Sequence, residues 1–199
     1  MFNINSNFIQ EFIQYCNLRN WKFDRYSSEF TFQFRIARYF DERFKNITLE
    51  LESNINRHNL FNLSKKEIDI EINHQPNTKY AIEIKYIRDS GTFNIGMINY
   101  LEDIKFIEEL KSTKVFEGGV AILFTCIPQM YNVPNQRLNP KNAENLELYK
   151  DFRIENRITN KVYQLRTGNF YKQIKLDGEY SIKWDEFKDG IKYCVINIV

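Results

Sequence analysis

The sequence predicts an α/β domain in which helices cover both faces of a mixed central sheet, with an antiparallel elaboration at the C-terminal end. Three observations support this fold class. In several segments apolar residues recur every three or four positions, as they do in amphipathic helices. In KEIDIEIN and YAIEIKYI they alternate with polar residues, as they do in strands. VAILFTC is a continuous apolar run, which is typical of a central strand buried on both faces.

Two amphipathic helices are expected before the first strand. The apolar spacing of residues 5–18 predicts the first helix. A longer helix is expected from about Ser28 to Phe44, with Ser27 or Ser28 as its N-cap, because a serine side chain accepts hydrogen bonds from the first backbone N–H groups of a helix. Glu29 then lies in the first turn of this helix.

The middle of the chain predicts the elements of a core. The six residues HQPNTK between two alternating segments contain proline and asparagine, which favour a turn, so these segments are expected to form an antiparallel hairpin. Each hairpin strand places isoleucines on one face and charged residues on the other. The expected elements are a strand at 47–53, the hairpin strands at 66–73 and 80–87, a helix at about 96–111 and the buried strand at 120–126.

The C-terminal part, 127–199, predicts the antiparallel elaboration. Three of the four prolines lie at its start and mark a long irregular loop. A hairpin turn is expected at Asp177-Gly178. No linker separates this part from the core at about 28–126, so we expect one domain over 1–199. The expected elements are a short helix near 143–151 and strands around 160–166, 171–176, 179–184 and 191–198.

The composition excludes several classes of protein. Of the 199 residues, 43% are apolar and 16% aromatic, far more buriable surface than a disordered chain carries. Cys16, Cys126 and Cys194 form no CxxC pair, so neither a disulfide framework nor a zinc knuckle is expected. The N-terminal segment lacks the basic and apolar regions of an export signal, and no apolar run approaches about 18 residues. We therefore expect a cytoplasmic protein with no membrane partner.

The formal net charge is only +2, but the charges are unevenly distributed. Residues 127–175 carry nine basic and four acidic side chains, whereas 1–126 carry 16 and 17 and 176–199 carry three and five. This local excess of base is compatible with a surface that faces phosphates and also with an ordinary solvated surface. The basic residues of the segment are Arg137, Lys141, Lys150, Arg153, Arg157, Lys161, Arg166, Lys172 and Lys175.

The expected hairpin carries the clearest chemical pattern. Asp69 on its first strand and Glu83 with Lys85 on its second lie on the polar faces of adjacent strands. Cross-strand neighbours have Cβ atoms about 4.5–5.5 Å apart, or about 7–8 Å on the diagonal, so one ion can reach both carboxylates. Mg²⁺ is often held by one or two carboxylates together with water and substrate phosphate. Lys85 points to the same side as Glu83 and can hold a water molecule or a phosphate oxygen.

Asp69, thirteen intervening residues and then Glu83-Ile84-Lys85, with Glu29 on a preceding helix, resemble the PD-(D/E)xK nuclease superfamily, whose fold type II restriction endonucleases share. The resemblance implies a restriction-endonuclease-like αβββαβ core. It implies that Asp69 and Glu83 ligate Mg²⁺, with Mn²⁺ as the alternative ion, and that the Ile84 carbonyl completes the ligand set. Lys85 would orient or help to deprotonate the attacking water. Glu29 would support the site or bind a second ion.

The resemblance covers residues 28–126, and one position departs from it, because Ile68 replaces the proline that precedes the first acid. The implied function is that of a Mg²⁺-dependent endonuclease that hydrolyses DNA by metal-activated water. Restriction, repair and defence against mobile elements are the implied roles, and RNA is left open as a substrate. A homodimer is also compatible, because one such site cuts one strand.

Two alternatives stand beside this interpretation. The chain is compatible with a non-catalytic member of the same fold that binds nucleic acid or a protein partner. It is also compatible with an unrelated α+β interaction module whose hairpin is a solvated ionic surface, although four acids then crowd around Lys85. Glu71 is expected at the surface, as are His58 and His74, which have no second histidine or cysteine at ligand spacing.

Overall fold

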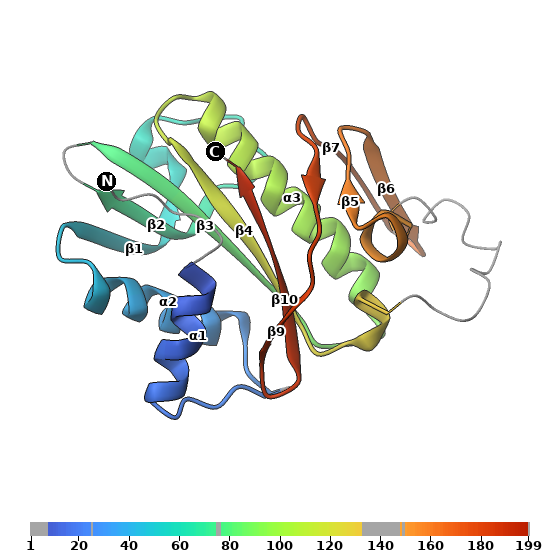
Figure 1. The fold of residues 1–199 in the computed structure, drawn as a ribbon. Helices are drawn as coiled ribbons and strands as arrows, with labels where there is room; N and C mark the ends of the chain where they lie inside the picture. Colours follow the sequence, from blue (N-terminus) through green and yellow to red (C-terminus); the bar gives the residue numbers. More distant parts are fainter. Residues whose placement is uncertain (1–7, 25, 75–76, 133–147, 149, 199) are drawn as a thin grey trace.

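A six-stranded mixed sheet forms the centre of the structure, a computed structural model that describes residues 8–24, 26–74, 77–132, 148 and 150–198 (Figure 1). Its strand order is β1-β2-β3-β4-β10-β9. β3 and β4 run parallel, and all other neighbours are antiparallel. The α/β class and the mixed central sheet are therefore confirmed. The strands are β1 (Ile47–Asn54), β2 (Glu67–His74), β3 (Thr78–Ile87), β4 (Gly118–Thr125), β9 (Asp185–Lys188) and β10 (Ile191–Ile198).

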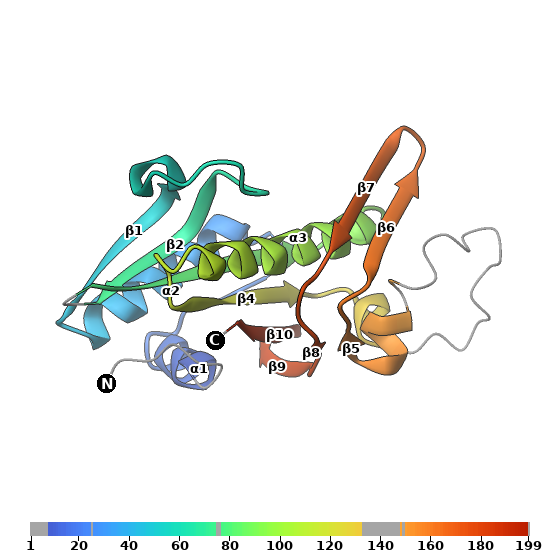
Figure 2. The same ribbon diagram turned by 90° about the horizontal axis from the view of Figure 1, so that it is seen from above.

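Helices cover both faces of this sheet (Figure 2). α1 (Phe8–Leu18) and α2 (Glu29–Arg43) pack on one face, and α3 (Phe93–Ser112) packs on the other. Three of the four expected helices are thus present with ends shifted by a few residues, and residues 5–7 lie outside the described part of the chain. Among the described residues, no helix combines the length and the apolar character needed to cross a bilayer.

α2 begins at a capping box. The Ser28 side chain accepts a hydrogen bond from the backbone N–H of Thr31 at 3.2 Å, and the Thr31 hydroxyl accepts one from the backbone N–H of Ser28 at 3.2 Å. These two bonds satisfy N–H groups that have no partner within the helix. Of the two expected serines, Ser28 is therefore the N-cap, and Glu29 is the first residue of the helix.

The charged face of β2 and β3 is buried in part, because Glu71 and Glu83 are enclosed whereas Asp69 is half-buried and Glu67 is exposed. Most isoleucines of these strands belong to the core cluster that also contains residues of α1 and α2, and the opposite face of β3 lies under α3. Glu71 is 1% exposed and Glu83 is 0% exposed. Strict alternation of apolar and polar residues usually indicates one solvated face. Here it indicates a sheet covered on both sides, with charged groups enclosed between β3 and α3.

The C-terminal part differs from the expectation in its pairing. The hairpin turn expected at Asp177-Gly178 is wrong, because β7 pairs with β6 whereas β8 pairs with β5. The N–H groups of Asp177 and Gly178 instead donate to the Glu108 carboxylate at 3.0 and 2.7 Å. β10 pairs with β4, so the elaboration supplies two strands of the central sheet.

The helix expected near 143–151 lies mostly outside the described residues. The remaining elements are β5 (Arg157–Ile158), β6 (Val162–Thr167), β7 (Phe170–Lys175), β8 (Tyr180–Ser181), η1 (Ile55–His58), η2 (Pro128–Met130) and η4 (Asp151–Glu155).

Candidate functional site

β2 and β3 separate near Asp69, and carboxylates fill the gap between them. Residue pairing between the two strands ends at Ile70 and Ile82, although β3 continues beyond that point. The backbone N–H of Ile84 then donates to Asp69 Oδ2 at 2.7 Å, and the N–H of Tyr86 donates to a carboxylate of α2 at 3.0 Å. Side-chain oxygens thus accept the bonds that backbone carbonyls of β2 would accept in a continuous ladder.

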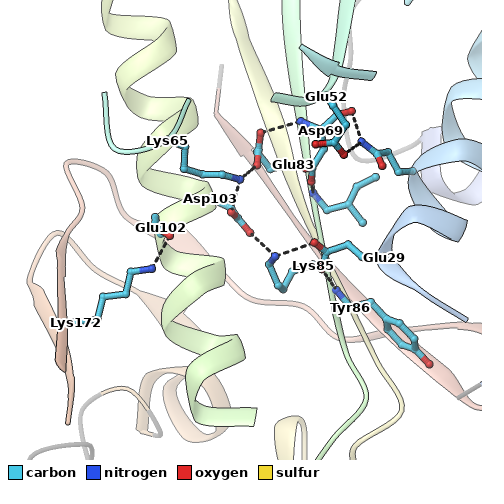
Figure 3. A network of polar contacts seen from close by, with 12 residues as sticks. Glu29, Glu52, Lys65, Asp69, Glu83, Lys85, Tyr86, Glu102, Asp103 and Lys172 are labelled. Atoms are coloured by element: carbon cyan, nitrogen blue, oxygen red, sulfur yellow. Dashed lines mark hydrogen bonds and ion pairs between the residues drawn. The ribbon is translucent and has the colours of Figure 1, made fainter. Parts of the chain in front are cut away.

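Asp69 and Glu83, the two expected metal ligands, lie together in this gap (Figure 3). The backbone N–H of Asp69 donates to Glu83 Oε1 at 3.3 Å. Burial raises the pKa of Asp69 to about 6, and the charges of Asp103 and Glu29 add to the effect. Burial and the Asp69 charge raise the pKa of Glu83 well above its ordinary value. The two carboxylates therefore occupy a place where negative charge is costly.

Lys85 lies between α2 and α3, with a carboxylate on each side. Its Nζ donates to Glu29 Oε1 at 3.0 Å and lies 4.0 Å from Asp103 Oδ2. The other oxygen of Glu29 accepts the Tyr86 N–H, so this side chain joins the first turn of α2 to β3. Burial alone would lower the pKa of Lys85, but Asp103 and Glu29 outweigh burial and raise it. Lys85 is therefore held as a cation beside the gap.

Lys65 and Asp103 complete the site, and neither was among the site residues expected from the sequence. The Lys65 ammonium forms an ion pair with Glu83 Oε2 and lies 2.9 Å from Asp103 Oδ1. Asp103 is 2% exposed, and its buried Oδ2 has no hydrogen-bond partner. Burial raises the pKa of Asp103 despite both lysines. Figure 3 shows the resulting chain of contacts, which runs from Lys65 through Asp103 and Lys85 to Glu29.

A pattern in the sequence could have identified Asp103. It lies three residues after Tyr100 and four before Ile107, both of which are fully buried, so it belongs to the apolar stripe of α3. An acid in such a stripe is seldom buried without a partner or a function. Lys65 offered no comparable pattern, because its position in the loop before β2 gives no period from which a direction can be inferred.

The site has more negative than positive charge. Four carboxylates, those of Glu29, Asp69, Glu83 and Asp103, are accompanied by the two ammonium groups of Lys65 and Lys85, which gives a formal charge of −2 with every group ionised. Buried ion pairs that serve structure alone tend to balance their charges. A deficit of two positive charges is what one divalent cation supplies.

The donor groups suit a small hard cation. Among the described residues, no three or more histidine, cysteine or acidic side chains form a ready-made metal cluster. Mg²⁺ does not need one, because it is commonly bound by one or two carboxylates with waters and substrate phosphate. Asp69 and Glu83 provide the two carboxylates. A strand residue directs its N–H and C=O to the same side, so the Ile84 carbonyl faces the gap that its N–H faces. These residues fit the ion that the resemblance implies.

Comparison of the chain with protein-family models, with curated proteins and with solved structures finds no match. Only the chemistry of these side chains therefore bears on what the chain does. All four site residues expected from the sequence, Glu29, Asp69, Glu83 and Lys85, are brought together by the structure through the contacts described above. The solvated ionic hairpin is wrong for Glu83, which is fully buried.

Glu71 and His58 were expected at the surface and form a second buried cluster. Glu71 accepts hydrogen bonds from the Ser53 hydroxyl at 2.6 Å and from Lys79 Nζ at 2.9 Å, and His58 Nε2 lies 2.7 Å from it. Burial alone would raise the pKa of Glu71, but its bonds with Ser53, Lys79 and His58 lower it to about 2. With its charge fully compensated, this cluster stabilises the fold and leaves no deficit for a cation to fill.

The basic segment 127–175 is partly neutralised within the chain. Lys150, Arg157, Lys161 and Lys172 form ion pairs with acidic side chains. Arg137 and Lys141 lie outside the described residues. The excess of base counted from the sequence therefore overstates the charge that the described part of this segment offers to a phosphate backbone.

Proposed function

We propose that this chain is a metal-dependent nuclease of the PD-(D/E)xK superfamily whose active site is the gap between β2 and β3. The observation that carries the proposal is the uncompensated charge at the point where the strands separate. Four carboxylates meet two ammonium groups there, and the pKa values of Asp69, Glu83 and Asp103 are all raised. Strongly raised pKa values in a cluster of acids are typical of functional sites.

Asp69, Glu83 and the Ile84 carbonyl would hold Mg²⁺ in this proposal. When bound, the ion supplies charge neutralisation at the phosphodiester and activation of water. Lys85 donates hydrogen bonds to the attacking water or to a phosphate oxygen. Because Asp103 and Glu29 raise its pKa, Lys85 acts as a hydrogen-bond donor and electrostatic group and not as the base. Glu29 fixes the position of Lys85 and does not need to touch the substrate.

The proposed reaction is hydrolysis of a phosphodiester. The water oxygen forms a bond to phosphorus as one P–O ester bond breaks, the water loses one proton to solvent, and the leaving oxygen takes up one proton from solvent to become a hydroxyl. DNA is the proposed substrate class, in restriction, repair or defence against mobile elements, and RNA serves as the comparison substrate in the test. A second copy of the chain would supply a second site for cutting both strands of a duplex.

The test compares cleavage by the wild-type protein and by three conservative variants, Asp69→Asn, Glu83→Gln and Lys85→Met. Each protein is incubated with supercoiled plasmid and with circular single-stranded DNA in millimolar Mg²⁺ or in EDTA. We expect cleavage by the wild type in Mg²⁺ only, and a loss of at least about 100-fold in each variant. Glu67→Gln is the matched control, because Glu67 is an exposed acid of the same strand, β2. Full activity in Asp69→Asn would refute the mechanism.

One observation favours the non-catalytic alternative, a nucleic-acid- or protein-binding module of the same fold. The Lys65 ammonium already contacts Glu83 and Asp103, so part of the acidic charge is compensated without any ion. Calorimetric titration with Mn²⁺ separates the two functions. A nuclease of this design binds Mn²⁺ in a way that Asp69→Asn abolishes, whereas a binding module shows no ion site that depends on Asp69.

A further inference from the structure

Two phenylalanines are exposed on α2, the helix whose first residue is Glu29 of the candidate active site. Phe30 is 59% exposed and Phe34 is 50% exposed, whereas Phe32 and Phe40 on the same helix are fully buried. Phe30 and Phe34 lie one helical turn apart, with ring centroids separated by 6.4 Å and planes inclined by 25°. Two nearly parallel aromatic rings are therefore exposed to solvent, and the free energy of burying them is not gained.

The aromatic pair borders a hollow that also contains positive charge. The hollow has a volume of about 340 Å³ and is lined by Trp21, Phe30, Thr31, Phe34, Arg35 and Arg38. The Arg35 guanidinium lies 5.1 Å from the centre of the Trp21 ring, and it donates to the backbone carbonyl of Lys22 at 2.8 Å. The same guanidinium lies 4.4 Å from the centre of the Phe23 ring, so these direct partners are uncharged and leave its positive charge in place beside the hollow. Arg38 is partly neutralised by Glu42, with Nε 2.9 Å from Oε1.

The exposed aromatic pair begins one residue after the candidate active site in the sequence. Phe30 directly follows Glu29, whose carboxylate contacts both Lys85 and the backbone of β3. The Cα atoms of Glu29 and Phe30 are therefore about 3.8 Å apart. A strand whose phosphate lies beside Lys85 would pass the first turn of α2 with its neighbouring nucleotides.

We propose that Phe30, Phe34 and Arg35 form a stacking platform for unpaired bases, so that the substrate is single-stranded DNA or DNA with a single-stranded segment next to the cleaved bond. Exposed aromatic rings beside cationic groups are the means by which proteins bind single strands without regard to sequence. Base pairs inside a duplex do not offer their faces to such rings, because each face is already stacked. This inference rests on the proposed nuclease function and specifies its substrate.

The experiment measures binding by fluorescence anisotropy in EDTA, where no cleavage occurs. The probes are a labelled oligothymidylate, the duplex of the same length and an oligonucleotide of the same length that lacks its bases. The variants are Phe30→Ala/Phe34→Ala and the control Phe61→Ala, which removes another exposed phenylalanine, one that is 63% exposed and lies in the loop before β2. Urea unfolding of each variant verifies that the fold is retained.

We expect the double variant to bind oligothymidylate about 5- to 100-fold more weakly than the wild type, because stacking contributes that factor for each base. Binding of the baseless strand and of the duplex should change less than twofold, and Phe61→Ala should match the wild type. Unchanged binding in the double variant, or an equal loss on the baseless strand, overturns the platform. A change in sedimentation of the double variant also overturns it, because the aromatic pair would then be a contact between copies of the chain.

Cleavage measured in parallel separates this inference from the proposed function. If the wild type cuts DNA in Mg²⁺ and the double variant binds and cuts single strands equally well, the platform is wrong and the nuclease proposal stands. If the wild type cuts none of the substrates, the nuclease proposal fails, and the anisotropy results still decide whether α2 binds unpaired bases.

Discussion

Replacing Asp69 by asparagine should stabilise the protein at neutral and alkaline pH. The pKa of Asp69 is about 6, against an ordinary value of 3.8, because burial and neighbouring acids disfavour the charged form. The difference corresponds to about 3 kcal/mol of folding free energy that is lost when the group ionises. Between pH 4 and pH 6 the folded state holds more protons than the unfolded state, so stability falls as pH rises through this interval.

Asparagine removes the charge and keeps a side-chain oxygen that can accept the Ile84 N–H. Asp69→Asn should therefore be more stable than the wild type by up to about 3 kcal/mol at pH 8, and the gain should shrink toward zero near pH 4. Urea unfolding followed by circular dichroism at pH 4, 6 and 8 measures it, with Glu67→Gln as the control. A variant that is less stable than the wild type at pH 8, or a gain that does not depend on pH, would refute the reasoning.

The same variant distinguishes a cation site from a merely strained one. A ligand that binds only the folded state stabilises it by RT ln(1 + [L]/Kd), which is about 1.4 kcal/mol at ten times the dissociation constant. Mg²⁺ should thus raise the unfolding free energy of the wild type at pH 8 and leave that of Asp69→Asn nearly unchanged. Equal stabilisation of both proteins would place any bound ion elsewhere.

Three further predictions concern other parts of the structure. Lys65→Met should bind Mn²⁺ several-fold more tightly than the wild type, because the Lys65 ammonium competes with a cation for Glu83. Calorimetry measures the dissociation constant of each protein, and weaker binding by the variant would contradict the prediction. Glu71→Gln should lose about 3 kcal/mol of stability at pH 7 and little at pH 2, because the pKa of Glu71 is lowered from 4.5 to about 2 and its stabilising charge is lost as pH falls through that range. Urea unfolding at several pH values checks this. A loss of stability that persists in full at pH 2 would contradict it. Gly119→Ala should destabilise the protein by about 1–3 kcal/mol in thermal unfolding, because the added Cβ would lie 2.2 Å from the Ala81 carbonyl oxygen. An unchanged melting temperature would disprove the close approach of β3 and β4 at this point.

The local part of the fold could be predicted from the sequence because local chemistry determines it. Ser28 caps α2 through its own side chain, and the alternating isoleucines define β2 and β3 whatever lies around them. These features place Glu29, Asp69, Glu83 and Lys85 on predicted elements. From those elements it could be expected that the four side chains lie close to one another.

The remaining features depend on contacts between distant segments. β10 pairs with β4 across about 70 residues of chain, and no period in either segment encodes that pairing. Asp177-Gly178 has the composition of a hairpin turn, but Glu108 on α3 binds its N–H groups and directs the chain away from β7. The burial of Glu71 likewise depends on the approach of Ser53, Lys79 and His58 and could not be inferred from β2 alone.

Anomalous X-ray scattering from a crystal of the wild-type protein soaked in Mn²⁺ tests the central claim most directly. We predict an anomalous peak in the gap between β2 and β3, within coordination distance of Asp69, Glu83 and the Ile84 carbonyl. The Lys65 ammonium should have moved away from Glu83 to make room for the ion. Density that is empty at this point, with Lys65 still paired to Glu83 at saturating Mn²⁺, would contradict the claim that these carboxylates form a metal site.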